Sequence, residues 1–205
     1  MTRLQAVVDS APKLNCPLVV MDTAPAAILG VGFDPMVAKR ERKIIVNVGN
    51  FHALAFRLGD GIEGVFEHHT GEIDLPKLET YIHALADGSL KHQDIFDDMG
   101  HGALIYGKQP FEFGKDDFDV VVTGPRRSMF STMDNGQQTV NHGLPSTVNR
   151  HLRPYFATPF GDMMMAGCFG LLAATAEAIP DLTETIQGSL REAGGRGRGV
   201  APWDG

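Results

Sequence analysis

The chain has 205 residues, 43% of them hydrophobic, which is enough apolar material for one domain, or one and a half, around a buried core. Its formal net charge of −7 argues against a protein that binds nucleic acid through a basic surface. No apolar run approaches a membrane span and no signal peptide is recognisable, so we expect a cytoplasmic protein without a membrane partner. The two cysteines, Cys16 and Cys168, predict neither a disulfide framework nor an iron–sulfur cluster, which needs several closely spaced thiolates.

The N-terminal part of the chain predicts a strand, a helix and a connection. Residues 17–21 are an apolar run typical of a buried strand. Residues 34–42 are polar and indicate an exposed connection. Between them lies a short predicted helix, with capping residues at its start and glycines at its end: Asp22 or Thr23, and Gly30 or Gly32.

The clearest pattern is an antiparallel meander. Strands are predicted over residues 44–48, 51–58 and 62–69 because apolar and β-branched residues dominate them. The Gly-Asn pair at 49–50 predicts a two-residue turn, and the Gly-Asp-Gly triplet at 59–61 predicts a three-residue turn.

These turn lengths predict a register. The first turn places Asn47 opposite His52, and the second places His52 opposite His68 and Arg57 opposite Glu63. One face of the meander should then be a core face, made of Leu54, Phe56, Leu58, Ile62 and Phe66.

The remainder of the chain alternates helices, loops and one more strand. Helical spacing of leucine and isoleucine predicts a helix over 74–86, and a short helix is expected over 90–99. Residues 99–102 indicate a loop, 118–123 a buried strand, and 161–178 an apolar helix buried on most sides. Residues 131–150, with the Asn135-Gly136 pair as a turn, are predicted to be irregular, and the glycine-rich tail from residue 194 to be disordered.

The first candidate site is the row that this register predicts. Asn47, His52 and His68 would lie side by side on one face, next to the turn of Gly49 and Asn50, and are our candidate catalytic residues. Two imidazoles could act as acid and base, or hold a metal with a third ligand. The alternative is that both histidines are partly buried and bonded to backbone. Glu67 and His69 should point to the opposite face. No metal-binding motif spacing is present, so we predict no metal site.

The second candidate site lies at the end of the strand predicted over 118–123. Ligands of open α/β sheets bind beyond the carboxyl ends of strands, so Thr123, Gly124 and Arg126 are candidate ligand-binding residues, together with Gly49 and Asn50. A plain turn with solvated arginines is the alternative. Asp22 is a further candidate because it follows a predicted strand. Three other histidines read as ordinary loop residues: His101, His142 and His151.

Several segments of the chain resemble a prokaryotic family described as pyruvate formate-lyase activating enzyme-like. The segments are VVMDTAPAAILG (19–30), VNVGNFHALAFRL (46–58), GVFEHHTGEI (64–73), VVTGPRRSM (121–129) and PFGDMMMAGCFGLL (159–172). The family description implies a glycyl-radical activase that uses S-adenosylmethionine.

The order of elements is also similar to the second lobe of the actin/Hsp70/sugar-kinase ATPase fold. That resemblance implies an α/β fold in which the first hairpin is a phosphate loop, here residues 47–52, and a later strand ends at an adenosine loop, here Gly124-Pro125. It implies ATP with Mg²⁺ as the ligand. Two residues depart from the pattern, since Asn47 stands where a carboxylate is expected and Pro125 where a glycine is expected.

The resemblance also predicts the domain organisation. Residues 1–43 would be a remnant of a preceding lobe, 44–180 the actin-like second lobe, and 181–205 a polar tail. A missing first lobe or a second copy of the chain would then be the partner.

Three functions follow. The first is a lobe that binds a nucleotide or another phosphorylated metabolite. The second is a non-catalytic accessory protein of the family. The third is a histidine-dependent metal hydrolase.

Overall fold

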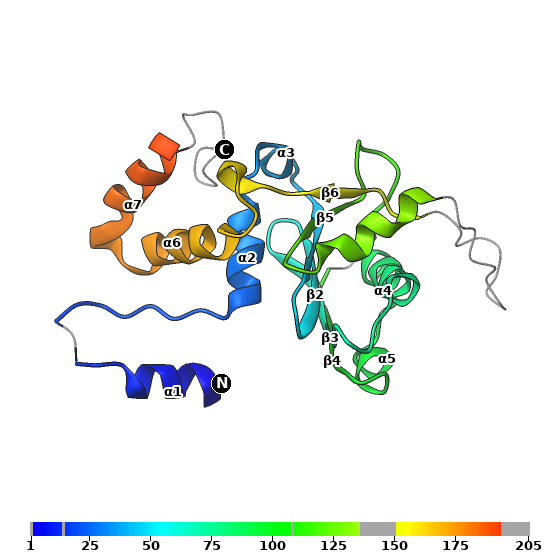
Figure 1. Cartoon of the computed structure of the whole chain (residues 1–205), viewed down its shortest axis with the longest axis horizontal. Coiled ribbons are helices and arrows are strands. Elements are labelled where there is room, and N and C mark those ends of the chain that lie inside the picture. Colours follow the sequence, from blue (N-terminus) through cyan, green and yellow to red (C-terminus); the bar gives the residue numbers. More distant parts are fainter. Residues whose placement is uncertain (1, 14, 108, 136–150, 194–205) are drawn as a thin grey trace. The chain divides into compact units, whose positions relative to one another are not determined.

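The computed structural model describes residues 2–13, 15–107, 109–135 and 151–193. The chain divides into two compact units, one made of Met1–Arg40 with Ala157–Gly205 and the other of Glu41–Phe156 (Figure 1). In the described parts of the chain, no helix is long and apolar enough to cross a membrane. The boundary differs from the prediction, because the segment after residue 156 groups with the N-terminal 40 residues.

The unit of residues 41–156 is built on one open, mixed six-stranded sheet. β1, β2, β3 and β4 are antiparallel neighbours, whereas β1, β5 and β6 run parallel. In spatial order the strands are β4 (Gly100–Ile105), β3 (Ile62–His69), β2 (His52–Leu58), β1 (Lys43–Val48), β5 (Val120–Thr123) and β6 (Pro154–Phe156). The predicted α/β class, the meander and the strand at 118–123 are therefore confirmed, while the likeness to an actin-type lobe stays a prediction.

The predicted register of the meander is wrong. Val48 pairs with Ala53, so four residues separate the last pair of β1 and β2, instead of the two that the predicted turn allows. The second turn does pair Leu58 with Ile62, but an irregularity between Arg57 and Leu58 shifts every later pair by one residue. Because side chains alternate along a strand, each one-residue shift exchanges the faces of the sheet.

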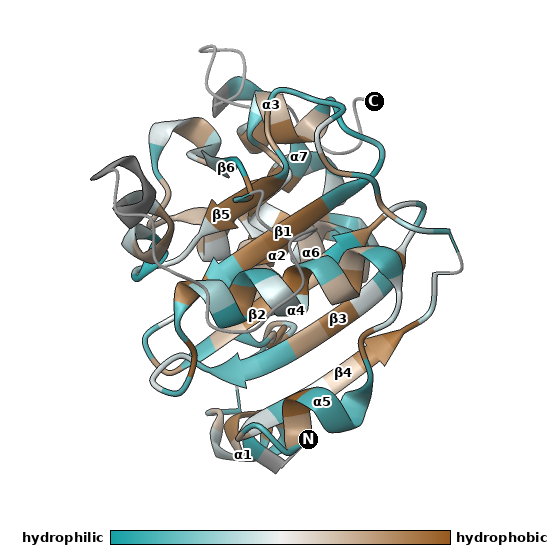
Figure 2. Cartoon of the chain, turned by 90° about the vertical axis from the view of Figure 1, so that its right-hand side faces the viewer, coloured by the Kyte–Doolittle hydropathy of each residue, from teal (hydrophilic) through white to brown (hydrophobic). Residues whose placement is uncertain are grey.

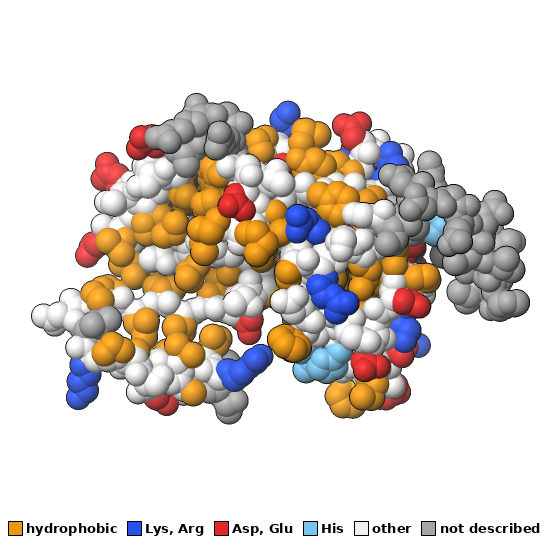
Figure 3. Space-filling model, in the orientation of Figure 1, with side chains coloured by type: hydrophobic (Ala, Val, Ile, Leu, Met, Phe, Trp, Pro, Cys, Tyr) orange, Lys and Arg blue, Asp and Glu red, His pale blue; other side chains and the backbone are white. Residues whose placement is uncertain are grey.

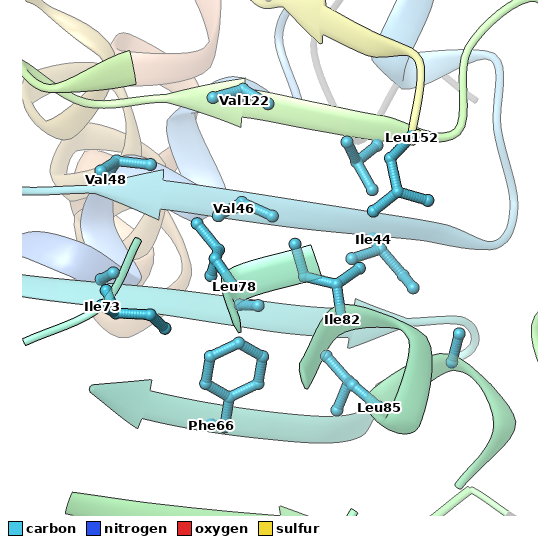
Figure 4. Packing of buried hydrophobic residues seen from close by; sticks show 14 of the residues in the cluster. Ile44, Val46, Val48, Phe66, Ile73, Leu78, Ile82, Leu85, Val122 and Leu152 are labelled. Carbon is cyan, nitrogen blue, oxygen red and sulfur yellow. The ribbon is translucent and has the colours of Figure 1, made fainter. Parts of the chain in front are cut away.

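One face of the sheet carries the main core, and we call it the α4 face. Alternate residues of β1 and β2, including Val46 and Ala55, point to this face and are completely buried. Helix α4 (Leu75–Asp87) crosses it (Figure 2), and α5 (His92–Phe96) adds Ile95 to the same cluster. Figure 4 shows the core between sheet and helix: Ile44, Val46, Val48, Phe66, Ile73, Leu78, Ile82, Leu85, Val122 and Leu152.

The ends of α4 follow its sequence signals. The Asp74 carboxylate accepts a hydrogen bond from the Lys77 N–H at 2.9 Å, which caps the first turn. Gly88 ends the helix in the left-handed conformation with φ of 83°. The predicted helix over 74–86 is thus confirmed to within one residue.

Arg57 anchors the C-terminal end of α4 from the sheet. Its side chain is completely buried, and its guanidinium donates to the carbonyls of Leu85 and Ala86 at 2.8 and 2.9 Å. Its Nε lies 3.2 Å from Oε2 of Glu63, so the predicted ion pair forms although Arg57 faces Gly64 in the register. A cation at the end of a helix is favoured by the helix dipole and by the unbonded carbonyls there.

The prediction that Leu54, Phe56 and Phe66 share one core face is also wrong. Leu54 and Phe56 lie on the opposite face from Phe66, because Phe66 pairs with Ala55. We call this opposite face the Asn47 face, since Asn47 pairs with Leu54. Ile62, at the start of β3, is exposed.

The other unit is helical in its described part, and two of its helices are packed unusually closely. α2 (Thr23–Val31) and α6 (Ala166–Ala178) lie side by side (Figure 1). A Cβ at Gly30 would lie 1.8 Å from the Ala166 carbonyl oxygen, and one at Gly170 would lie 1.8 Å from that of Ala26. Only glycine permits such an approach of two helix backbones.

Asp34 joins two segments of this unit that are far apart in the sequence. The buried Asp34 caps α3 (Pro35–Ala38) and also accepts from the Thr158 N–H at 2.9 Å. The other helices are α1 (Thr2–Ser10), η2 (Pro159–Gly161) and α7 (Pro180–Ala193).

Several expectations outside the meander are wrong. Residues 17–21 form no strand, and none of them is buried, while residues 34–42 include α3. The loop expected at 99–102 is instead the start of β4, and part of the tail expected at 181–205 is α7. The helix expected over 90–99 shortens to α5, and the one over 161–178 begins at Ala166 and leaves two leucines exposed, Leu171 and Leu172.

A few expectations fall partly beyond the described part of the chain. Asn135 ends the 3-10 helix η1 (Arg127–Asn135), whereas Gly136, His142 and most of 131–150 lie outside the described residues, as does the tail from residue 194.

Candidate functional site

The carboxyl ends of β1 and β5 bring two glycine turns together. Asn47 and Thr123 pair across these parallel strands and are both buried, so the strands end level with each other. Gly124 follows with φ of 100°, and a Cβ there would lie 2.4 Å from the Val48 carbonyl oxygen. A Cβ at Gly49 would lie 2.7 Å from the His52 carbonyl oxygen. Both positions therefore need glycine, one for its backbone angle and both for space.

The Asn47 side chain lies between the two turns. Its Oδ1 would be 2.9 Å from a Cβ on Gly124, and its Nδ2 would be 3.8 Å from a Cβ on Gly49. The residue is 9% exposed, and within the described parts of the chain its amide makes no side-chain hydrogen bond. This amide is therefore available to bond to a ligand or to water.

The turn after β1 is held in place by the end of β3. Thr70 donates from Oγ1 to the Gly49 carbonyl at 2.9 Å and from its N–H to the Phe51 carbonyl at 2.8 Å. The Gly49 N–H is itself bonded to the His52 carbonyl at 2.9 Å. Among the described residues, nothing accepts from the N–H groups of Asn50 and Phe51 at the tip of the turn.

The turn after β5 is tied to β1. The Arg126 N–H donates to the Val48 carbonyl at 3.0 Å, so this exposed arginine starts at the end of β1. The structure thus brings together five of the predicted ligand-binding and catalytic residues: Asn47, Gly49, Thr123, Gly124 and Arg126. Asn50 lies next to them, at the tip of the turn after β1.

His68 does not belong to this group, because it lies on the α4 face. It pairs with Ala53 and is completely buried. Its Nδ1 lies 3.0 Å from the His69 carbonyl, and its Nε2 lies 3.1 Å from Oδ2 of Asp98. Its ring also stacks on Tyr81 with a centroid distance of 6.0 Å. The predicted row of Asn47, His52 and His68 is therefore wrong, and the partners of His68 indicate a structural role.

Asp98 is the centre of a small polar network around His68. It accepts hydrogen bonds from Lys77 at 2.9 Å and from the Tyr81 hydroxyl at 2.8 Å. Burial favours a higher pKa for Asp98, but the hydrogen bonds from Lys77, Tyr81 and His68 outweigh it and hold the pKa below its ordinary value. Burial and the neighbouring carboxylate together raise the pKa of Tyr81.

His52 instead belongs to a cluster of three histidines on the Asn47 face. It pairs with His69 across β2 and β3, and His101 of β4 completes the group. The ring centroids are 5.0 Å apart for His52 and His69, 4.9 Å for His52 and His101, and 4.7 Å for His69 and His101. Figure 3 shows histidine side chains gathered at the surface in the region where Figure 1 draws β3 and β4.

A carboxylate supports this histidine cluster. Oε1 of Glu67 lies 3.2 Å from Nδ1 of His52, and both side chains are about one third exposed. The sequence prediction that Glu67 and His69 face away from His52 is wrong, because it depended on the shifted register.

His101 was missed as a site residue because it lies in an irregular part of β4. The pairing with β3 passes from Glu67 with Gly102 to His68 with Gly100, which leaves His101 as an extra residue. Its flanking glycines were the available signal, since Gly102 has φ of 111° and glycine favours bulges.

Asp22 lies in the other unit, directly before α2, and its side chain makes no capping hydrogen bond. Its predicted role in ligand binding stays a prediction.

The architecture defines a mixed α/β protein with an open six-stranded sheet. Over residues 1–129, more than half of its length, the chain matches the family described as "Putative pyruvate format-lyase activating enzyme (DUF1786)", and it belongs to this family. Searches of curated proteins and of solved structures gave no match.

The family description implies an iron–sulfur cluster, and the residues of this chain do not fit one. A four-iron cluster takes roughly four cysteine thiolates in one site. The chain has Cys16 and Cys168, both exposed and free. Two thiolates do not make up that ligand set.

Proposed function

We propose that the unit of residues 41–156 binds a phosphorylated small molecule, with ATP and Mg²⁺ as the first candidate, at the carboxyl ends of β1 and β5. The observation that carries the proposal is the meeting of two glycine turns, at Gly49 and Gly124, around the buried amide of Asn47.

The topology of the sheet supports this location. After β1 the chain turns to β2 on one side, and after β5 it continues to β6 on the other side. Adjacent parallel strands whose connections leave in opposite directions form a switch point, and open α/β sheets bind ligands outside the carboxyl ends of strands at such points.

The groups at this edge suit an anion. The N–H groups of Asn50 and Phe51 lie at the tip of the turn that Thr70 holds, and Asn47 adds an amide donor between the turns. Successive backbone N–H groups in a turn form an anion-binding concavity. Arg126 supplies a positive charge that can form two parallel hydrogen bonds to a phosphate.

The resemblance to an actin-like lobe favours a nucleotide over a simple phosphate. The chain order agrees with that resemblance: a hairpin, helices, and then a strand that ends in Thr123-Gly124. In such an arrangement the nucleotide lies between two lobes. We therefore propose that a preceding lobe or a second copy of the chain supplies the other wall of the site.

Thermal unfolding of the full chain in the presence of ATP and Mg²⁺ tests the proposal. A ligand present at a hundred times its dissociation constant stabilises the folded state by about 2.7 kcal/mol, which raises the melting temperature by several degrees. ADP and inorganic phosphate, used as separate probes, distinguish a nucleotide site from a phosphate site.

A pair of arginine variants locates the binding. Arg126→Ala should weaken the shift, because it removes the cation beside the glycine turns. Arg3→Ala, which changes an exposed arginine of the other unit, is the matched control and should keep the shift. The absence of any shift with all three probes, or an equal shift in both variants, contradicts the proposal.

A further inference from the structure

We propose that His52, His69 and His101 bind one transition-metal ion, with Zn²⁺ as the best match. This metal site is independent of the proposed phosphate site, although both lie on the same unit. The three side chains come from three neighbouring strands, so their backbone positions are fixed by the sheet.

The spacing of the imidazoles suits a single ion. One nitrogen from each ring can be chosen so that all three lie within 4.8 Å of one another. In a tetrahedral zinc site with bonds of about 2.0–2.1 Å, two ligand nitrogens are roughly 3.4 Å apart, so small side-chain rotations close the set. The rings are mutually inclined by 49°, 84° and 55°, so they are not locked in a parallel stack.

Glu67 orients one of the ligands. Its carboxylate lies 3.2 Å from Nδ1 of His52, and a proton held on Nδ1 beside this carboxylate would leave the lone pair of Nε2 for a metal. Imidazoles that bind metals commonly donate their other N–H to a carboxylate, which fixes the tautomer and raises the basicity of the ligand. Glu67 and His52 are placed for this arrangement.

The chemistry of the donors selects the kind of metal. Imidazole suits zinc, copper, iron and nickel, whereas magnesium and calcium prefer oxygen ligands. The site would therefore not be the one that holds the Mg²⁺ of a nucleotide. Three protein ligands leave a fourth position of a tetrahedral ion open, as in catalytic zinc sites.

The exposure of the cluster allows entry of an ion. His52 and His69 are half-buried, whereas His101 is exposed at the edge strand. The His52 carbonyl also accepts from the Gly49 N–H, so the metal site begins at the residue that closes the glycine turn.

Titration of the full chain with metal alone tests the site. After removal of bound metal with a chelator, Zn²⁺ should bind with a stoichiometry of one per chain, measured by calorimetry. Co²⁺, added instead, should give the intense visible absorption of a tetrahedral ion. Nucleotide is absent throughout, so this result is separate from that of the phosphate proposal.

Three variants make the test specific. His101→Ala removes an exposed ligand and should abolish the one-to-one binding, with the folded state checked by circular dichroism. Glu67→Gln should keep the stoichiometry but weaken the affinity by about 10–100-fold, the usual cost of losing a partner of a metal ligand. His83→Ala, on α4 beside Phe113, is the control and should bind as the unchanged protein does. Binding that is equally tight in His101→Ala and His83→Ala overturns the proposal, as does the lack of stoichiometric binding in the unchanged protein.

Discussion

Two neighbouring histidines of β3 lie in opposite surroundings. His68 is completely buried on the α4 face, with its ring nitrogens beside the His69 carbonyl and the Asp98 carboxylate. His69 is half-buried on the Asn47 face, and its ring centroid lies 5.0 Å from that of His52 and 4.7 Å from that of His101. One step along the strand therefore separates a histidine with fixed protein partners from one that faces other imidazoles.

The difference between these two histidines extends to the polar residues of the two sheet faces. On the α4 face, polar residues are bonded to the protein and connect the sheet to its helices, as Arg57 and His68 do. On the Asn47 face, Asn47 and the histidine cluster lie at the strand ends that we propose as ligand sites. Substitutions on the first face should lower stability, and those on the second should change binding.

The largest effect is expected at Arg57. Arg57→Ala leaves the buried carbonyls of Leu85 and Ala86, near the end of α4, without their cationic donor, and it removes one of the two arginines that pair with Glu63. Removing one member of a buried charged network costs about 3–5 kcal/mol. Urea unfolding followed by circular dichroism should show this loss. Arg126 is exposed, so the free energy of unfolding of Arg126→Ala should stay within about 0.5 kcal/mol of that of the unchanged protein. An equal loss of stability in Arg57→Ala and Arg126→Ala would contradict the comparison.

The second largest loss of stability is expected for His68→Ala. The substitution opens a cavity on the α4 face and removes one hydrogen bond to Asp98, which together should cost roughly 2–4 kcal/mol. The three histidines that we propose as metal ligands lie on the other face, so the variant should still be stabilised by Zn²⁺. If the urea midpoint of His68→Ala equals that of the unchanged protein, His68 has no structural role.

Asp98→Asn should have a smaller effect that depends on pH. The pKa of Asp98 is lowered in the folded state, so its contribution to stability is complete above its unfolded-state pKa of about 3.9 and is lost as the pH falls through the lower folded value. Because the carboxylate is one third exposed, we expect a loss of about 1 kcal/mol at neutral pH. The gap in unfolding free energy between the variant and the unchanged protein should close below about pH 4. A gap that is constant from neutral to acid pH would contradict this account.

Local sequence patterns were sufficient for much of the fold. The strands at 43–48, 52–58 and 62–69 and the helix α4 follow from alternation, turn residues and caps, all of which act between residues close in sequence. The glycine turns at Gly49 and Gly124 were identified for the same reason, since positions that need glycine are visible in the sequence.

The register and the histidine cluster could not be predicted in the same way. Gly-Asn favours a turn that pairs Val48 with Phe51, but Thr70 bonds to this turn and Val48 pairs with Ala53 instead. These bonds join residues about twenty positions apart, so no local pattern reveals them. His101 joins the histidine cluster only because β4 pairs with β3 and contains an extra residue, and both facts depend on the assembled sheet.

The smallest change in intrinsic stability is expected at His69, and it completes the comparison with His68. Without metal, the free energy of unfolding of His69→Ala should lie within about 0.5 kcal/mol of that of the unchanged protein, because the side chain that is lost is only half-buried. In free Zn²⁺ at a hundred times the dissociation constant, the unchanged protein should gain about 2.7 kcal/mol and the variant should gain almost nothing. His68→Ala should show the reverse, with low stability and the full zinc increment, in parallel thermal melts. If both variants lose the increment, zinc stabilises the fold through contacts other than this cluster, and the two faces of the sheet do not act separately.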